Sequence, residues 1–166
     1  MSTDRAGGAE PGTASQFVWR RRVAFAETDM AGIVHFANFH RYMEEAEHAC
    51  FRTLGLSIVQ PQDDGPVIGW PRVQSACTYE APAYYDELLE IRIDLARVGM
   101  KSLTWRFEFH RGAVRIARGE LKTVCCLCRA EASSGAAGPG WPSMRLESIE
   151  IPERYRAVLQ PSPFIA

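Results

Sequence analysis

The clearest periodic pattern along the chain lies between His35 and Leu54. Apolar side chains recur there at intervals of three and four residues, as they do on one face of an α-helix. Gly55 follows, at the place where a helix commonly ends. The apolar stripe consists of Phe36, Phe39, Met43, Ala46, Cys50 and Leu54. The pattern predicts one long helix over residues 35–54 that buries one face.

Shorter runs rich in β-branched and aromatic residues predict strands on both sides of this helix. In one run, Leu103, Trp105 and Phe107 alternate with polar residues, which is typical of a sheet with one buried face. One strand, one helix and then an antiparallel series of strands define an α+β domain whose sheet must wrap the helix to cover its apolar stripe. The predicted strands are residues 16–25, 67–79, 87–98, 101–110, 113–128 and 143–151.

Composition and charge narrow the class of protein. The chain has 166 residues, 46% hydrophobic and 23% charged, which predicts one folded domain over residues 16–166. Residues 1–15 lack large apolar side chains and are expected to be a disordered tail, and residues 131–142 to be a flexible connection. A net charge of -1 argues against binding to nucleic acid or to an anionic membrane. Without an apolar run of about 20 residues or a secretory signal, we expect a cytoplasmic protein.

The five cysteines are interpreted as buried thiols. Their number is odd, and three of them lie within residues 125–128, so a disulfide framework is not expected. A zinc site at this cluster would need a second ligand pair at suitable spacing, and the neighbouring sequence offers none.

The segment 25–42 reads Phe-Ala-Glu-Thr-Asp-Met-Ala-Gly-Ile-Val-His-Phe-Ala-Asn-Phe-His-Arg-Tyr. It resembles the signature of the hot-dog acyl-CoA thioesterases of the 4-hydroxybenzoyl-CoA thioesterase type. Residues 79–88, the Lys101-Ser102 pair and residues 151–155 are similar to later parts of that family, in the same order. The resemblance implies a hot-dog fold, with an antiparallel sheet of five or six strands around one long helix. It also implies a homodimer or homotetramer with active sites at the subunit interface.

This resemblance implies hydrolysis of an acyl-CoA thioester to a carboxylic acid and free CoA, with no cofactor. Carried over, Asp29 is the nucleophile or the general base, the Phe36 backbone N–H binds the carbonyl oxygen, and Gly32 bends the loop. The residues alone agree in part, because free N–H groups at a helix N-terminus stabilise an oxyanion and residues 33–37 contain no Ser, Thr or Asp to cap them. Asp29 could equally be an ordinary loop carboxylate. Asn38 either caps the helix or orients Asp29.

Several residues are candidates for binding the substrate. His40 and Glu44 could face the acyl pocket, with Trp70 and Val73 lining it. Near the predicted hairpin of residues 97–102, charged and polar side chains could hold the phosphate groups of CoA. Each assignment has a simpler alternative. His40 and Glu44 could lie on a solvated helix face, and Trp70 could be an aromatic residue of the core. The side chains near the hairpin could be ordinary surface charge. The nucleotide candidates are Arg97, Lys101 and Ser102.

A zinc site on the helix is the tempting alternative. His40, Glu44 and His48 are spaced by four residues, so they share one flank of the helix and could hold zinc. The thioesterase mechanism that the resemblance implies needs no metal, and we expect none.

Two other functions fit the same fold. An acyl-carrier-protein thioesterase would cleave the same bond on a tethered substrate, and acyl carrier protein would then be a partner. A non-catalytic acyl-CoA-binding protein would keep the groove and lose the acid, against which the presence of Asp29 argues. The acyl group, the choice between dimer and tetramer and the exact role of Asp29 stay open at this stage.

Overall fold

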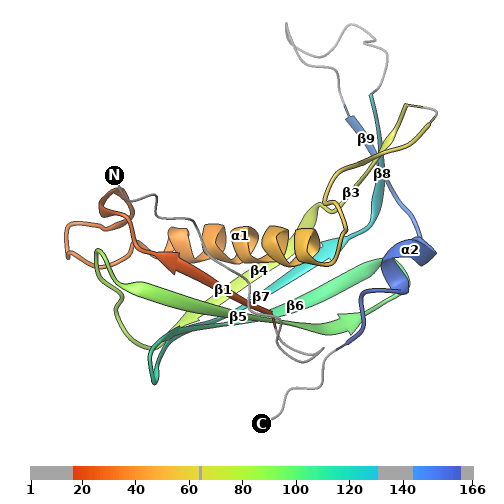
Figure 1. The fold of residues 1–166 in the computed structure, drawn as a ribbon. Coiled ribbons are helices and arrows are strands. Elements are labelled where there is room, and N and C mark those ends of the chain that lie inside the picture. Colours follow the sequence, from red (N-terminus) through yellow and green to blue (C-terminus); the bar gives the residue numbers. More distant parts are fainter. Residues whose placement is uncertain (1–16, 64, 131–143, 162–166) are drawn as a thin grey trace, which may run out of the picture.

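The computed structural model describes residues 17–63, 65–130 and 144–161 (Figure 1). The predicted tail and the predicted connection at residues 131–142 lie outside the described residues. The elements are β1 Phe17–Arg22, the 3₁₀ turn η1 Phe25–Glu27, α1 Ala37–Thr53, β2 Gln60–Pro61, β3 Val67–Gly69, β4 Arg72–Tyr79, β5 Leu88–Val98, β6 Ser102–Arg111, β7 Val114–Val124, β8 Cys126–Ala130, β9 Met144–Ser148 and α2 Glu153–Arg156.

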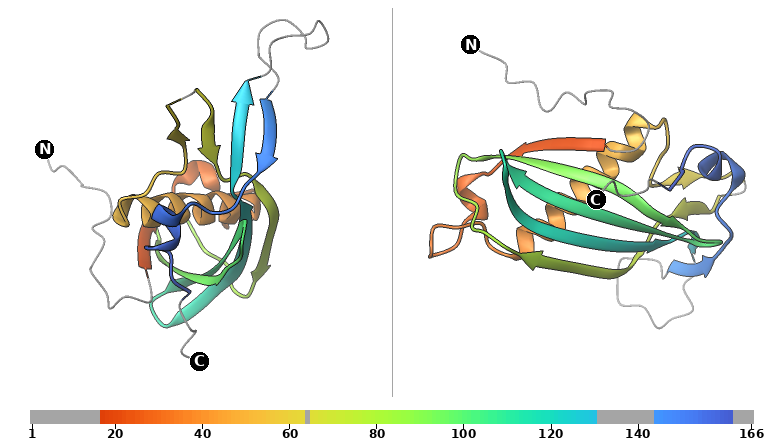
Figure 2. Two further views of the ribbon diagram at one scale, coloured as in Figure 1. Left: turned by 90° about the vertical axis from the view of Figure 1, so that its right-hand side faces the viewer. Right: turned by 90° about the horizontal axis from the view of Figure 1, so that it is seen from below.

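The main sheet has five antiparallel strands in the order β1-β5-β6-β7-β4. It curls around α1, which lies in its concave face (Figure 1 and Figure 2). The predicted α+β, hot-dog arrangement is thereby confirmed, and α1 falls within the predicted range of 35–54. The two edges of the sheet are β1 and β4.

The core is formed by the apolar face of α1 against the alternating apolar side chains of the sheet. Phe39 packs edge-to-face on Phe109 with ring centroids 5.2 Å apart, and Phe51 contacts Trp105 at 5.8 Å. The buried face of the helix is wider than the predicted stripe, since Tyr42 and Glu47 are also buried. The prediction of burial is wrong at the two ends of the stripe. Phe36 and Leu54 are exposed, because the sheet does not extend over them.

A glycine in the middle of β7 lets the helix approach the sheet. Gly119 is buried, and an added Cβ would clash with Sδ of Met43, which is itself fully buried on α1. The missing side chain at residue 119 is therefore what makes room for the Met43 side chain.

Two predicted strands are interrupted in the structure. The predicted run 67–79 splits into β3 and β4 at Trp70 and Pro71, because proline has no N–H to donate to a neighbouring strand. The predicted run 113–128 splits at Cys125, whose N–H donates to the carbonyl of Lys101 at 2.7 Å. After these breaks the chain forms a second sheet in the order β2-β3-β8-β9, which the sequence analysis did not predict.

The C-terminal segment closes the end of the main sheet. Arg156 donates to the carbonyls of Gly99 and Met100 in the turn between β5 and β6, at 3.0 and 2.6 Å. Tyr155 is buried and donates its hydroxyl to the Ser57 carbonyl at 2.9 Å. The short helix α2 that carries these two residues was not predicted, since a single turn gives no periodic signal.

All five cysteines are free thiols. Cys50, Cys125 and Cys126 are buried as expected, whereas Cys77 and Cys128 are partly exposed. Burial raises the pKa of Cys50 to about 12 and that of Cys125 to about 11. These two thiols therefore stay protonated and unreactive at neutral pH.

The contact at Gly119 can be tested directly. We expect Gly119→Ala to destabilise the protein by about 1–3 kcal/mol, because the added methyl group overpacks the contact with Met43. Urea denaturation measures the change. Met43→Ala is the matched compensating change, and the double variant should be less destabilised than the sum of the single variants. Additive effects would contradict the proposed clash.

Candidate active site

Asp29 opens a tight loop between η1 and α1. Its N–H donates to the Ile33 carbonyl and its own carbonyl accepts from the Gly32 N–H, both at 2.9 Å. Gly32 has a φ of 75°, a left-handed conformation that favours glycine. The bend expected at Gly32 is thus present, and the loop carries an exposed Asp29.

The Asp29 carboxylate takes part in the loop itself. Oδ1 accepts a hydrogen bond from the Ala31 N–H at 2.8 Å. This is the loop role considered from sequence. It also holds the carboxylate of the exposed Asp29 in one orientation. Among the described residues, no hydrogen bond is made to its other oxygen, Oδ2.

The first turn of α1 leaves one backbone donor free. Ala37 N–H donates to Nδ1 of His35 at 3.3 Å, Asn38 N–H to the His35 carbonyl at 2.9 Å and Phe39 N–H to the Phe36 carbonyl at 3.2 Å. Within the described part of the chain, no hydrogen bond uses the Phe36 N–H. Sequence reasoning missed the capping role of His35, because it considered only Ser, Thr and Asp as caps.

Asn38 fixes the segment just before Asp29. It is buried, and its Nδ2 donates to the Glu27 carbonyl at 2.8 Å. The same carbonyl accepts from the His35 N–H at 2.9 Å. The capping role is wrong, since Asn38 lies inside α1 and its amide donates to the Glu27 carbonyl. The other role, orienting Asp29, stays a prediction. Asn38 joins the start of α1 to the segment that leads into the loop.

The Glu27 side chain is the second anchor of this segment. Its carboxylate accepts from the Ala24 N–H at 2.8 Å and from the Tyr42 hydroxyl at 2.9 Å, and it forms an ion pair with Arg21. Arg21 also pairs with Glu45 and lies 4.2 Å from the ring centre of Tyr42. This network holds β1, η1 and α1 together beside the Asp29 loop. No sequence pattern predicts this network, because its partners come from separate elements.

Burial and charge act in opposite directions on this network. Burial lowers the pKa of Arg21, but Glu45 and Glu27 outweigh it and the net pKa is raised. Burial and the hydrogen bond to Glu27 raise the pKa of Tyr42 well above its usual value. Arg21 therefore stays charged and Tyr42 stays protonated as a donor.

Two side chains join α1 to the edge strand β4. Nδ1 of His40 lies 2.5 Å from Oγ of Ser75. At the end of the strand, the Tyr79 hydroxyl donates to the Phe36 carbonyl at 3.2 Å. His40 and Phe36 thus lie on the open flank of the helix that faces β4.

An ionic cluster lies further along the same flank. Arg72, at the start of β4, pairs with Glu44 at 3.2 Å and with Glu47 at 2.7 Å, and its Nη2 lies 3.3 Å from Nε2 of His48. In place of the metal ion considered from sequence, a guanidinium lies between Glu44 and His48. Among the described residues, no three His, Cys, Asp or Glu side chains gather closely enough to hold a metal ion.

Burial dominates the titration of this cluster. It raises the pKa of Glu47 to about 7, although Arg72 partly offsets the effect. Burial and then Arg72 lower the pKa of His48. His48 is therefore neutral at pH 7.

Trp70 does not line an open cavity in this chain. It is 3% exposed and packs edge-to-face on Tyr155 at 5.2 Å and on Phe51 at 5.8 Å. This is the core position considered as the alternative, and it lies where α1 ends rather than where it begins. Val73 is exposed on β4, so its role in the acyl pocket stays a prediction.

The predicted nucleotide residues lie at the opposite end of the sheet from Asp29. The Asp29 loop pairs with Tyr84, just before β5, whereas Lys101 follows the end of β5. Eleven residues of strand separate the two ends, which is roughly 35 Å. Lys101 donates to the Ser148 carbonyl at 3.0 Å, Arg97 is exposed and Ser102 begins β6. One chain does not bring them to Asp29.

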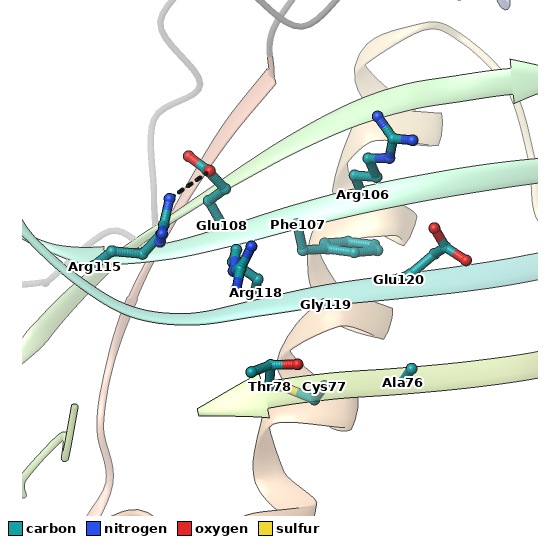
Figure 3. A pocket seen from close by; sticks show the side chains of 10 residues that line it. All are labelled: Ala76, Cys77, Thr78, Arg106, Phe107, Glu108, Arg115, Arg118, Gly119 and Glu120. Carbon is teal, nitrogen blue, oxygen red and sulfur yellow. Dashed lines mark hydrogen bonds and ion pairs between the residues drawn. The ribbon is translucent and has the colours of Figure 1, made fainter. Parts of the chain in front are cut away.

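A hollow of about 450 Å³ lies on the other face of the sheet (Figure 3). Arg106 and Arg118 point into it from β6 and β7, away from α1, and Arg115 pairs with Glu108 at its rim at 3.4 Å. None of the predicted site residues lines it. The candidate site is therefore the open flank between α1 and β4, together with the Asp29 loop.

Comparison with known proteins gives the family context. Residues 31–117 match the Thioesterase superfamily, a segment that starts two residues after Asp29. The 4-hydroxybenzoyl-CoA thioesterase of Pseudomonas sp. is 29% identical over 86% of this chain and 96% of its own. The 1,4-dihydroxy-2-naphthoyl-CoA hydrolase of Thermosynechococcus vestitus is 29% identical over 64% of this chain and 73% of its own. The structure of BH1999 gentisyl-coenzyme A thioesterase superposes with a TM-score of 0.65 at 25% identity, over 86% of this chain and 98% of that one.

Within residues 17–63, 65–130 and 144–161, no helix has both the length and the apolar character to cross a membrane.

The buried carboxyl of Glu47 predicts a pH-dependent stability. Its pKa is raised in the folded state, so the unfolded chain loses this proton first and folding stability falls as pH rises from about 4.5 to about 7. In Glu47→Gln this dependence is absent. We therefore expect the stability of the variant relative to the wild type to rise by roughly 3 kcal/mol across that range, measured by urea denaturation.

Glu90→Gln is the matched control, because Glu90 forms a partly exposed ion pair with Arg20 on the outer face. Its stability relative to the wild type should show no comparable rise over the same range. Parallel pH curves for the wild type and Glu47→Gln would contradict the buried, raised carboxyl.

Proposed function

Because the chain belongs to the thioesterase superfamily, we propose that it hydrolyses an acyl-CoA thioester to a carboxylic acid and free CoA, with Asp29 as the reacting carboxylate. The likeness to hydrolases of 4-hydroxybenzoyl-CoA and 1,4-dihydroxy-2-naphthoyl-CoA, and to a gentisyl-CoA thioesterase, supports a hydroxylated aromatic acyl group. The observation that carries the proposal is an exposed Asp29 on a tight loop just before a helix that leaves the Phe36 N–H free.

The geometry fits the two demands of thioester hydrolysis. One demand is a group that attacks the carbonyl carbon or activates water to do so. The carboxylate of Asp29, held through Oδ1 by the Ala31 N–H, supplies this group. The other demand is a donor for the oxygen that becomes negative, and the Phe36 N–H at the positive end of α1 fits it. The C–S bond then breaks, and CoA leaves as a thiolate that takes up a proton.

We also propose that the active unit is at least a dimer paired through β4. This strand is an edge of the main sheet and is exposed along almost its whole length. Unpaired edges of this kind are completed by another strand or blocked. β4 runs from the end of the sheet near the β5–β6 turn towards the Asp29 end. Antiparallel pairing of two copies would therefore bring the β5–β6 turn of the partner subunit towards Asp29.

Such a pairing gives the nucleotide candidates a role. Within one chain, Arg97 and Lys101 lie at the far end of β5 from the Asp29 loop, and β5 is roughly 35 Å long. In the proposed dimer, Asp29 of one subunit and Lys101 of the partner subunit lie at the same end of the joined sheet. One CoA molecule would then contact both subunits, and the phosphate groups would meet the side chains proposed for them.

Substitution of Asp29 tests the central role. We expect Asp29→Asn to fold and bind acyl-CoA while its kcat falls by more than about a hundredfold, because the amide is close in shape but is a poor nucleophile and base. A panel of hydroxylated aromatic and aliphatic acyl-CoA substrates measures the rate. Asp63→Asn, on an exposed turn in the second sheet, is the control and should keep full activity. Near-normal turnover by Asp29→Asn would exclude this role.

Heavy-oxygen water separates the two forms of the mechanism. If Asp29 attacks the carbonyl, an anhydride forms, and water attacking the aspartyl carbon places ¹⁸O in Asp29. If Asp29 is a general base, a single turnover labels only the product acid. Mass spectrometry of the protein after one turnover detects the label, and a labelled Asp29 excludes the pure base mechanism.

Mixed dimers test the shared site. We expect Asp29→Asn and Lys101→Glu, each weak alone at low substrate, to regain about a quarter of wild-type activity when co-assembled, because half of the dimers then contain one intact site. Light scattering should show at least twice the 18.6 kDa of one chain. An active monomer, or no recovery on mixing, would rule out a site built from two subunits.

A further inference from the structure

The backbone donor proposed for the oxyanion belongs to a residue whose side chain does little to hold it. Phe36 is 59% exposed, and its one ring contact among the described residues is with the neighbouring His35, at 4.4 Å. It lies directly before α1, which begins at Ala37, so no earlier helical turn supports it. The direction of the Phe36 N–H therefore depends on what holds the two peptide groups that flank its Cα.

Two short-range hydrogen bonds hold these peptide groups from within the helix. The peptide group with the Phe36 N–H also carries the His35 carbonyl, which accepts from the Asn38 N–H at 2.9 Å. The next peptide group carries the Phe36 carbonyl, which accepts from the Phe39 N–H at 3.2 Å. Because a peptide group is planar, each bond also sets the direction of the N–H in its plane. Both bonds span only three residues at a helix end, where the backbone frays most readily.

Tyr79 supplies the contact that reaches this turn from the sheet. It is the last residue of β4, at the end of the strand near the start of α1, and its hydroxyl donates to the Phe36 carbonyl at 3.2 Å (Figure 2). Its ring packs against Phe39 with ring centroids 5.2 Å apart, and its backbone pairs with Ala117 of β7. Partial burial, and then the neighbouring Cys77, raise the pKa of Tyr79 to about 12, so the hydroxyl stays protonated and can donate. The sheet thus restrains a carbonyl that the helix holds only through its first turn.

We propose that Tyr79 is a positioning residue that acts through the backbone of Phe36 and aims the Phe36 N–H at the carbonyl oxygen of the thioester. The inference rests on the proposed thioesterase function, in which this N–H stabilises the oxyanion. A donor that is already aimed stabilises the transition state most, because nothing has to reorient as the charge develops. A frayed first turn would point the N–H in several directions and lose part of that stabilisation. In this role the Tyr79 hydroxyl bonds to the Phe36 carbonyl and does not contact the reacting atoms.

Removal of one hydroxyl group tests the kinetic part of the proposal. Tyr79→Phe keeps the ring on Phe39, so it should retain a cooperative thermal melt. With 4-hydroxybenzoyl-CoA as the probe, we expect kcat to fall by about tenfold and KM to stay within about twofold, because the oxyanion forms only in the reaction. The loss should be smaller than the roughly hundred- to thousandfold cost of a whole oxyanion donor, since the N–H is misdirected rather than removed. Tyr85→Phe is the matched control: it removes the hydroxyl of an exposed tyrosine, keeps the ring that contacts Phe25 at 5.7 Å and should leave kcat unchanged.

The amide of Phe36 reports the positioning itself, without substrate. Selective ¹⁵N labelling of the eight phenylalanines gives few enough NMR signals to follow, and the signal lost in Phe36→Leu is the one required. In the free protein, Tyr79→Phe should lower the order parameter of the Phe36 N–H, whereas Tyr85→Phe should not. A tyrosine that only touched the substrate would leave this amide unchanged.

The two measurements together decide the role of Tyr79. An unchanged kcat in Tyr79→Phe, a loss confined to KM or an unchanged Phe36 amide in the free variant would overturn the positioning role. Failure of the wild type to hydrolyse any acyl-CoA would instead overturn the proposed function, and the inference with it.

Discussion

The burial of one face of α1 in the concave side of the sheet is the constraint on which the rest of this structure depends. Phe39 and Phe51 pack against aromatic side chains of β6, and Gly119 leaves room for Met43. These contacts are close and apolar, so they fix the helix both along and around its axis. Once the axis is fixed, the positions of the helix N-terminus and of its open flank follow.

The polar contacts near Asp29 are a consequence of that placement. Asn38 and Tyr42 lie on the first two turns of α1, and both reach Glu27, one through its carbonyl and the other through its carboxylate. Arg21 joins the same carboxylate from β1. The segment before the loop is therefore held by three elements at once. A loop with one polar contact would leave the carboxylate free to move, whereas this one holds Asp29 at a defined place shortly before the start of α1.

The open edge of the sheet links the single chain to its proposed function. The sheet covers the buried face of α1, and within the described residues β4 has no neighbouring strand on one side. Along this edge polar groups join the helix and the strand, His40 with Ser75 and Glu44 with Arg72. One ring contact, of Phe39 with Tyr79, adds to them. A flank with polar groups and an unpaired strand is suited both to a second subunit and to a polar acyl group. The proposed dimer and the proposed substrate class both concern this one surface.

Much of the fold was predictable from the sequence, because the helix, the strands and the Asp29 loop depend on residues close together in the chain. Apolar residues at intervals of three and four predicted the helix over 35–54, and their alternation predicted the strands of the main sheet. The motif around Asp29 and Gly32 predicted the loop before the helix. What the sequence missed joins residues that are far apart in the chain. Examples are the network around Glu27, the core position of Trp70 and the placement of Asp29 and Lys101 at opposite ends of β5. All of them depend on how the sheet folds around the helix.

The open flank of α1 shows most clearly which features the sequence could predict and which it could not. Spacing alone placed His40, Glu44 and His48 on one side of a helix, which is a property of 3.6 residues per turn and needs no tertiary contact. Spacing could not show that Arg72, from a strand 24 residues further on, would lie between them. It also could not show that Glu47 would be buried under that arginine, since burial depends on which element covers the helix face. The sequence thus determined which residues share a face, and the tertiary structure decided what each of them meets there.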